Sequence, residues 1–358
     1  MKVKNLGDFE HVPDILQAIS AEDILQLEKK QADGWDILAE IELDEYTIYT
    51  PVNFAIMMDC FAVVKWLVER GAELNSKKEP SFLLAVRYSE NEAMIRYLAD
   101  KGADIHAVNN VKSEAFTEAI YGKKFHNLPL IEALGHSVAK YGGKAFRSAV
   151  SDRNYSLLDF FIAHGVDVDF NQPDMVYSFK PTPLCVAARY VDLEMCRYLV
   201  ANGADVKLAE KDGMRPYSIA VERGDEEMAA YFRALEPVEF HQKENKLLAL
   251  KSYRLSKDVK EFLQGEQLHI ELEGDVAFVD FFTLTDTIEM KIGRKKYLRI
   301  SKKVDNYSDL HFLWNPRTKK IACYDEEHLE VVDMAPFSAF IQDISGLIER
   351  LFMGEFDN

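Results

Sequence analysis

Residues 182–187 read Thr182-Pro183-Leu184-Cys185-Val186-Ala187, and Gly203-Ala204-Asp205 follows them after a second apolar segment. Threonine suits the position before a helix, because its hydroxyl accepts a hydrogen bond from a free backbone N–H. Proline suits the first turn, whose N–H has no partner within the helix. Glycine suits the left-handed conformation that ends a helix. This stretch therefore predicts a pair of helices closed by a glycine turn.

Copies of the same unit occur on both sides of this stretch. Clear signatures are Thr50-Pro51-Val52-Asn53-Phe54-Ala55 and Arg215-Pro216-Tyr217-Ser218-Ile219-Ala220, and weaker copies end at Ala85, Ala119 and Ala149. The spacings between successive alanines are 30, 34, 30, 38 and 33 residues. A repeat of this length indicates helix pairs that bury their apolar faces by stacking on one another.

A second marker, a glycine after an apolar helix, follows every copy except the last. The markers are Gly71-Ala72-Glu73, Gly102-Ala103-Asp104, Gly135-His136-Ser137, Gly165-Val166-Asp167 and Gly203-Ala204-Asp205. Both markers together resemble the ankyrin family, whose period is about 33 residues and whose signature is Thr-Pro-Leu-His-x-Ala. The resemblance implies an all-α solenoid of about six repeats over residues 49–236 that binds another protein. The copy at 114–137 is degenerate, because Glu114-Ala115 replaces Thr-Pro.

The segment before the repeats, residues 1–48, is predicted to be a helical N-terminal cap. Its helix periodicity lacks the repeat signature, and Ser20-Ala21-Glu22-Asp23 is typical of a helix start. The array is predicted to end at Glu236-Pro237. Because the linker is short and the final repeat is rich in apolar residues, we expect the following domain to pack on that repeat as its cap.

The ankyrin resemblance implies that partner-binding residues lie at loop tips and on the concave side of the first helices, directly after the alanine signature. These concave positions are Met57, Met58, Arg87, Tyr88, Tyr121, Ser151, Asp152, Arg189, Tyr190, Glu222 and Arg223. All of them except Ser151 and Glu222 are taken as candidates for partner binding. The pair Arg-Tyr occurs twice in the same phase, and both residue types are enriched at interface hot spots. We therefore expect both Arg-Tyr pairs to be exposed on one surface; the alternative is that the tyrosines only cover neighbouring repeats.

The 38-residue spacing marks an insertion at residues 170–180 that contains Met175, Tyr177 and Phe179. Insertions in repeat arrays map to loops, often on the binding face. These three side chains are therefore further candidates for partner binding. The alternative is that they fold back onto the array.

The C-terminal part, residues 237–358, is predicted to be an α+β domain. A helix is expected over 246–263 with a break near Leu255-Ser256-Lys257-Asp258, and an amphipathic helix over 337–352. Between them, six strands are expected at residues 268–272, 277–282, 297–300, 311–314, 321–324 and 329–332, with a hairpin connection at 315–320.

Several motifs of this domain resemble the SUKH superfamily, a group that includes a yeast cell-wall-assembly regulator. They are Leu255-Ser256-Lys257-Asp258-Val259-Lys260-Glu261-Phe262-Leu263, the segment 282–288 before an expected short helix, and the late strand pair that ends in 321–328. Two departures are Ser256 in place of proline and Gln264-Gly265-Glu266 in place of an Asn-Gly turn. The resemblance covers about residues 240–345. It implies an immunity-type protein that neutralises a toxin; the alternative is an ankyrin adaptor with a structural C-terminal domain.

The charge balance restricts the class of partner. The net charge is -17, and residues from 237 onward, with 22 acidic and 17 basic side chains, contribute -5 of it. Such acidity disfavours nucleic acid and anionic membranes, which attract clustered cations. It is compatible with a basic protein partner, such as a basic toxin domain, and equally with acidity that only maintains solubility.

Motifs for catalysis or cofactors are missing: the sequence has no P-loop, HExxH, GxGxxG or GxSxG pattern. We therefore expect no enzyme, no cofactor and no metal; Asp325-Glu326-Glu327-His328 is expected to form a solvated turn. A basic run, Lys291, Arg294, Lys295, Lys296, Arg299, Lys302 and Lys303, is interpreted as a charged strand edge. A nucleic-acid site is the alternative, but only Tyr297 supplies an interleaved aromatic.

Targeting signals are not evident either. The four cysteines form no CxxC pair, residues 1–10 lack the apolar stretch of a signal peptide, and no apolar run approaches the length of a membrane span. A cytoplasmic location is expected. The oligomeric state is left open.

Overall fold

The structure is a computed structural model that describes residues 2–3, 7–8, 12–44 and 47–356. The chain forms two compact units. Unit 1 comprises residues 1–170 and 174–178, and unit 2 comprises residues 171–173 and 179–358. The predicted domain boundary at residue 237 therefore lies inside unit 2. Residues 1, 4–6 and 9–10, part of the segment in which no signal peptide is expected, lie outside the described residues.

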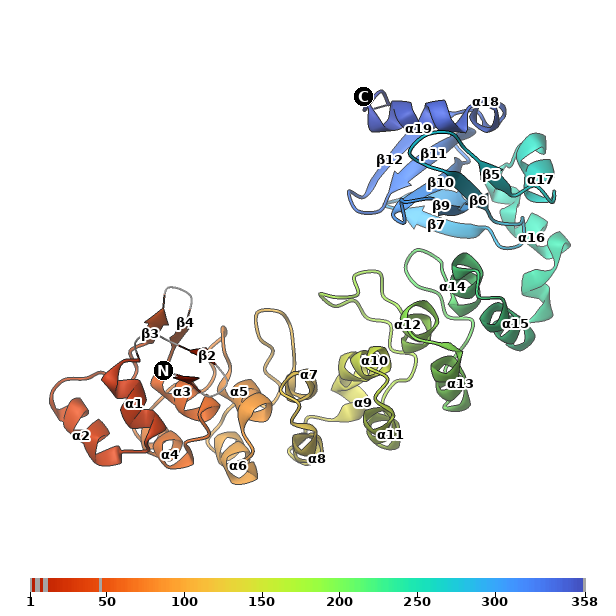
Figure 1. Cartoon of the computed structure of the whole chain (residues 1–358). Coiled ribbons are helices and arrows are strands. Elements are labelled where there is room, and N and C mark those ends of the chain that lie inside the picture. The colour runs from red at the N-terminus through yellow and green to blue at the C-terminus, as the bar shows by residue number, and fades with distance from the viewer. Residues whose placement is uncertain (1, 4–6, 9–11, 45–46, 357–358) are drawn as a thin grey trace. The chain divides into compact units, whose positions relative to one another are not determined.

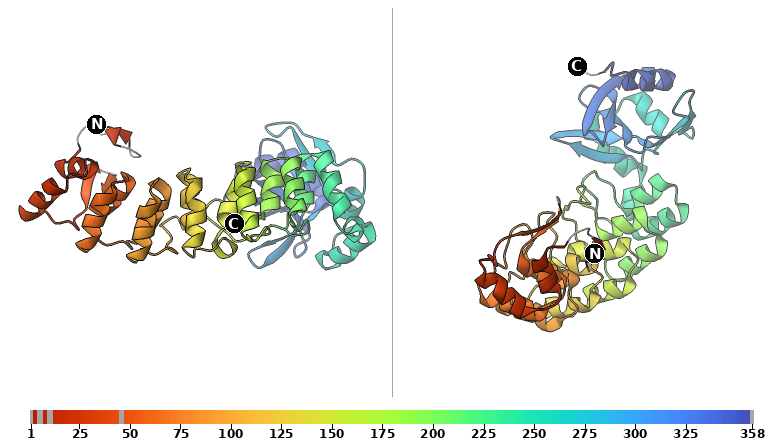
Figure 2. Two further views of the ribbon diagram at one scale, coloured as in Figure 1. Left: turned by 90° about the horizontal axis from the view of Figure 1, so that it is seen from below. Right: turned by 60° about the vertical axis from the view of Figure 1, so that its left-hand side comes forward.

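Unit 1 is built mainly from helix pairs. Its elements are β1 (Lys2–Val3), β2 (Gly7–Asp8), α1 (Asp14–Ser20), α2 (Ile24–Ala32), β3 (Ile41–Asp44), β4 (Thr47–Tyr49), α3 (Pro51–Met57), α4 (Phe61–Glu69), α5 (Ser81–Tyr88), α6 (Glu92–Asp100), α7 (Ala115–Tyr121), η1 (Phe125–Asn127), α8 (Leu128–Ala133), α9 (Val138–Tyr141), α10 (Gly143–Ser151) and α11 (Tyr155–Ala163). Figure 2 shows the pairs stacked side by side, and α3, α5, α7 and α10 contact one another in that order.

The repeat signatures act as predicted. The Thr50 hydroxyl accepts a hydrogen bond from the N–H of Asn53, and Pro51 begins α3. The five glycines that end second helices, Gly71, Gly102, Gly135, Gly165 and Gly203, have φ angles of +79° to +101°. This left-handed backbone lets the chain turn toward the next repeat, and glycine adopts it without a steric penalty.

The N-terminal segment differs from the prediction in two details. Ser20 ends α1, and the cap of α2 is Asp23, whose carboxylate accepts a hydrogen bond from the N–H of Gln26. The segment is also not wholly helical, because β3 and β4 form an antiparallel hairpin before the first repeat.

Unit 2 contains two helix pairs and the α+β region. Its elements are α12 (Pro183–Tyr190), α13 (Leu193–Ala201), α14 (Pro216–Arg223), α15 (Glu226–Leu235), η2 (Val238–His241), α16 (Lys243–Ala249), η3 (Leu250–Tyr253), α17 (Lys257–Leu263), β5 (His269–Glu271), β6 (Phe278–Phe281), β7 (Ile288–Ile292), β8 (Lys295–Arg299), β9 (Ser301–Val304), β10 (Leu310–Asn315), β11 (Lys320–Asp325), β12 (Glu330–Ala335), α18 (Phe337–Gln342) and α19 (Ile344–Phe352). In Figure 1 the strands lie between α14 on one side and α18 and α19 on the other.

The strands form two antiparallel sheets, one of five strands in the order β12-β11-β10-β8-β7 and one of three in the order β5-β6-β9. One face of the larger sheet packs against α17, α18 and α19 in a core that contains Phe312, Trp314 and Phe340. The Trp314 indole N–H donates to the carbonyl oxygen of Tyr253 at 2.9 Å, which satisfies the polar atom of this buried ring.

All six predicted strands of this region are present, but two others and a helix break were missed. The SUKH resemblance implied a short helix after the segment 282–288, but β7 begins there, at Ile288. β9 follows β8 directly. The final helix is divided at Asp343, whose carboxylate accepts a hydrogen bond from Gly346 N–H and so begins α19. β9 was missed because Lys302 and Lys303 interrupt its apolar pattern. β7 alternates apolar Ile288, Met290 and Ile292 with charged residues, so its pattern was readable as a half-buried strand.

Candidate partner-binding site

The first Arg-Tyr pair lies at the end of α5 in unit 1. Glu118 of the next repeat, which is buried, accepts a hydrogen bond from Arg87 Nη1 at 2.9 Å and another from Asn109 Nδ2 at 2.9 Å. The guanidinium of Arg87 lies 5.2 Å from the ring centroid of Tyr88. Burial would lower the pKa of Arg87, but Glu118 outweighs it and raises this pKa. Arg87 is therefore held as a fixed cation beside Tyr88.

A hollow of about 190 Å³ lies beside this pair, and we call it the tyrosine hollow. Its lining is Tyr49, Met57, Lys78, Glu79, Pro80, Leu83, Leu84, Arg87, Tyr88, Asn109, Asn110, Val111 and Glu118. Val111 in the preceding loop is 56% exposed, and Tyr121 at the end of α7 is 52% exposed. The hollow thus combines apolar contact area with a fixed cation, as interface hot spots do.

The insertion of residues 170–180 folds back onto α10 in part. Arg147, fully buried, pairs with the carboxylate of Asp174, and its guanidinium lies 4.8 Å from the ring centroid of Tyr177. The Tyr177 hydroxyl lies 2.9 Å from Ser151 Oγ. Burial would raise the pKa of Asp174, but hydrogen bonds from Tyr177 N–H and Arg147 lower it. At the tip of the loop, the side chain of Met175 is 71% exposed and is therefore accessible to a partner.

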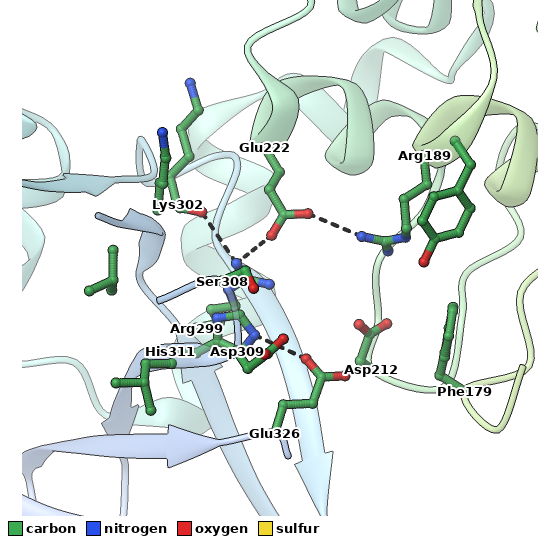
Figure 3. A pocket seen from close by; sticks show the side chains of 14 residues that line it. Phe179, Arg189, Asp212, Glu222, Arg299, Lys302, Ser308, Asp309, His311 and Glu326 are labelled. Atoms are coloured by element: carbon green, nitrogen blue, oxygen red, sulfur yellow. Dashed lines mark hydrogen bonds and ion pairs between the residues drawn. The ribbon is translucent and has the colours of Figure 1, made fainter. Parts of the chain in front are cut away.

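The second Arg-Tyr pair borders a cavity of about 500 Å³ in unit 2, between the last repeats and the C-terminal strands (Figure 3). We call it the junction cavity. Its lining is Phe179, Arg189, Tyr190, Asp212, Glu222, Arg299, Lys302, Lys303, Val304, Ser308, Asp309, Leu310, His311 and Glu326. Cations and carboxylates are equal in number among these residues, so the cavity has little net charge.

A chain of ion pairs crosses the junction cavity. Arg189 contacts Glu210 Oε2 at 2.6 Å and Glu222 Oε2 at 3.3 Å, and the other oxygen of Glu222 pairs with Arg299 of β8. His311 Nε2 lies 3.1 Å from Glu326 Oε2 on the far side. Figure 3 shows Glu222 between the two guanidinium groups. The chain joins the last two repeats to the five-stranded sheet.

Burial and pairing set the protonation of these groups. Burial raises the pKa of Glu210 to about 8, although Arg189 acts in the opposite direction. Burial also raises the pKa of Asp212. The hydrogen bond from His311 lowers the pKa of Glu326. Pairing thus offsets part of the free-energy cost of burying these charged groups. Such paired groups are typical of a structural joint, and few of them are free for chemistry.

Further contacts hold the last repeat and the C-terminal domain together. The Tyr217 hydroxyl of α14 donates to Asp286 Oδ1 of the C-terminal domain at 3.0 Å. Within that domain, Lys246 Nζ of α16 donates to the carbonyl oxygen of Thr287, the residue after Asp286, at 2.7 Å. Burial lowers the pKa of Lys246 to about 8. The expected packing of this domain on the last repeat agrees with these contacts. On the side of the last repeat they come from Tyr217 and Glu222 of α14.

Comparison with known proteins defines part of the chain. A family model of ankyrin repeats, three copies, matches residues 146–240. These residues are ankyrin repeats. No curated protein matches the chain. The solved human ASB11 ankyrin repeat domain is similar, with 18% identity and a TM-score of 0.47 over 62% of this chain and 98% of that chain.

Ankyrin repeats indicate a protein–protein interaction module, and most of the predicted contact residues reach the surface. Tyr121, Asp152, Met175, Tyr190 and Arg223 are exposed, and Met58, Arg87, Tyr88, Tyr177, Phe179 and Arg189 are half-buried. Neither tyrosine of the two Arg-Tyr pairs is buried between repeats, since Tyr190 is 57% exposed and Tyr88 is half-buried. The exception is Met57, which is 1% exposed and packs in the core, because its position on α3 turns toward the repeat interior.

Several residues that shape these ankyrin surfaces were missed from the sequence. Glu118 fixes Arg87, and Glu210 supports Arg189. Glu222 was expected at a concave position and Arg299 in the basic run, but their ion pairs with Arg189 and with each other were not expected. A carboxylate about one repeat after each arginine was the available signal. Arg223 also has a structural contact, because it donates to the carbonyl oxygen of Ala188.

The absence of metal and membrane-spanning sites applies to the part of the chain that the structure describes. It contains no group of three His, Cys, Asp or Glu side chains placed to hold a metal ion. Asp325 accepts hydrogen bonds from the N–H and the ring of His328 within a turn. No helix among the described residues has both the length and the apolar character to cross a membrane.

Proposed function

We propose that this protein binds a partner protein at the tyrosine hollow. The observation that carries the proposal is the Arg87–Glu118 pair, which fixes a cation beside Tyr88 while Val111 and Tyr121 remain exposed nearby. Aromatic rings next to a fixed guanidinium bind with little loss of side-chain entropy. The exposed Met175 on the insertion loop supplies a further apolar contact in the same unit.

Substitutions of Tyr88, which lines the hollow, and of Tyr121, which is exposed nearby, test this proposal. A photo-crosslinking residue at position 121 should capture a partner from the native cell, and Tyr88→Ala or Tyr121→Ala should weaken its binding by about tenfold or more. Leu25→Ala is the matched control, because Leu25 is 80% exposed in the same unit and lies outside the hollow. Equal binding by all three variants would refute the proposed surface.

The finer proposal is that the partner is a toxin and that this protein is an immunity-type protein. Two observations support it: the C-terminal motifs resemble the SUKH superfamily, and the net charge of -17 favours a basic partner. An acidic surface speeds encounter with a basic domain and competes with nucleic acid for it. The ankyrin surface and the C-terminal domain each offer a place for the toxin.

Co-expression separates immunity from the alternative of an adaptor. The toxin to use is one encoded beside this gene, and growth of cells that carry both is the measurement. Rescue by the wild type, reduced by Tyr121→Ala, supports an immunity protein that acts through the ankyrin surface. Failure to rescue from any neighbouring toxin, with a partner still captured at position 121, supports the adaptor.

A further inference from the structure

Three basic segments of the C-terminal domain, far apart in the sequence, meet at one place. They are residues 251–254, 291–296 and 315–320. Their cationic side chains are Lys251, Arg254, Lys291, Arg294, Lys295, Lys296, Arg317, Lys319 and Lys320. The three segments contain no carboxylate. In a chain with a net charge of -17, this is a local reversal of charge.

The segments border a hollow of about 780 Å³, which we call the basic hollow. Its lining is Ser252, Arg254, Lys295, Lys296, Tyr297, Asn315, Pro316, Arg317, Thr318, Val331 and Asp333. η3, the β7–β8 hairpin, the β10–β11 turn and β12 supply these residues. The volume is within the range of about 300–1,000 Å³ that is typical of ligand sites.

Local structure fixes the hollow while its cations stay available. Lys296 Nζ lies 4.9 Å from the ring centroid of Tyr253. Asn315 Nδ2 donates to Asp333 at 2.8 Å, so the one carboxylate among the lining residues already has a hydrogen-bond donor. Lys295 and Arg317 are exposed. Among the described residues, none of the nine cations of the three segments forms an ion pair. A charged strand edge alone would not require cations from three segments around a hollow.

We propose that the basic hollow binds an acidic segment of a partner protein. Guanidinium groups such as those of Arg254 and Arg317 match carboxylates with paired hydrogen bonds, and the lysines add attraction along an extended chain. Nucleic acid fits less well. The aromatic ring of the hollow, Tyr297, is 4% exposed and offers no stacking surface, and the acidic remainder of the protein repels a long polyanion.

Fluorescence anisotropy with a labelled oligo-glutamate peptide tests the site on the full chain. The wild type should bind, and added NaCl should weaken binding because surface charges are screened. Lys295→Glu and Arg317→Glu should each weaken it by about tenfold or more. The matched control is Lys243→Glu, an exposed lysine on α16 outside the hollow with the same change of charge. It should change binding by less than about twofold.

Other outcomes overturn the proposal. They are no binding of oligo-glutamate by the wild type, an equal loss in Lys243→Glu, or tighter binding of a labelled single-stranded oligonucleotide, which would assign the hollow to nucleic acid. Thermal unfolding of each variant shows that the fold is kept, as expected for exposed side chains. The test does not involve the tyrosine hollow, so its result is independent of the proposed function.

Discussion

Gly213 lies against the backbone of Glu289: a Cβ atom at Gly213 would be 2.5 Å from the carbonyl oxygen of Glu289. Gly213 precedes α14 in the last repeat, and Glu289 is in β7 of the C-terminal domain. The φ angle of Gly213 is +90°, in the region that favours glycine. Two backbones thus meet at a point where no side chain fits.

Gly213→Ala should therefore destabilise unit 2 by more than the cost of placing alanine at a positive φ, because the new Cβ atom also clashes with Glu289. We expect a loss of about 2–4 kcal/mol in the free energy of unfolding, from the strained φ and from the displacement of β7. Gly203→Ala is the control, because Gly203 has φ of +97° and no atom within 4 Å of its Cβ position. Urea unfolding measures both. Equal losses would show that the contact with Glu289 contributes nothing.

Arg299→Met should strongly lower the free energy of unfolding of unit 2, because Arg299 is paired at the junction cavity. Arg299 is buried, pairs with Glu222 and donates from Nε to the carbonyl oxygen of Ser301 at 3.1 Å, so its removal leaves a half-buried carboxylate with one partner fewer. Removal of one partner from a buried pair costs about 3–5 kcal/mol. Arg197→Met, which breaks the exposed pair with Glu227, should cost about 0–1 kcal/mol. Similar losses in chemical unfolding of the two variants would contradict the buried role of Arg299.

Lys246 should make stability depend on pH in the alkaline range. Its pKa is about 8 in the folded chain against 10.5 for the ordinary side chain, because burial disfavours the charge. Between these values the unfolded chain binds more protons, so stability rises with pH, and it is lost as pH falls toward 8. The contribution of Lys246 to this rise is up to about 3 kcal/mol. Lys246→Met should remove it, as urea unfolding at pH 8 and pH 10.5 would show. A parallel pH profile in wild type and variant would refute this assignment.

Glu114 should be more important than an ordinary helix cap. It stands at the position that Thr50 and Thr182 occupy in their repeats, and it caps α7 by accepting from the N–H groups of Phe116 and Thr117. Its carboxylate also lies 3.0 Å from His136 Nε2. Glu114→Ala should cost about 2–4 kcal/mol, because it leaves buried donors unpaired. Asn91→Ala, which removes the cap of α6 in the same unit, should cost about 1 kcal/mol. Thermal unfolding that ranks Asn91→Ala as the more damaging change would disprove this interpretation.

The repeats, the order of most C-terminal elements and the exposure of most of the candidate partner-binding residues could be predicted from the sequence. These features depend on local signals. The Thr182 hydroxyl accepts a hydrogen bond from the N–H of Cys185, three residues further on, and so caps α12. Gly203 ends a helix by its own backbone conformation. A strand was also readable where it contains a continuous apolar run, as Ile321–Tyr324 of β11 does, and was missed where lysines interrupt the run, as in β9.

The pairing of charges and the clustering of cations depend on the tertiary structure and could not be predicted from the sequence. Arg299 and Glu222 are separated by 77 residues, and the segments of the basic hollow around Arg254, Lys295 and Arg317 come from three separate turns of the chain. No local pattern encodes such neighbours, because sheet order and the packing of β7 on the last repeat bring them together. Burial then sets the charge of Glu210 and Lys246, and burial is a property of the whole fold.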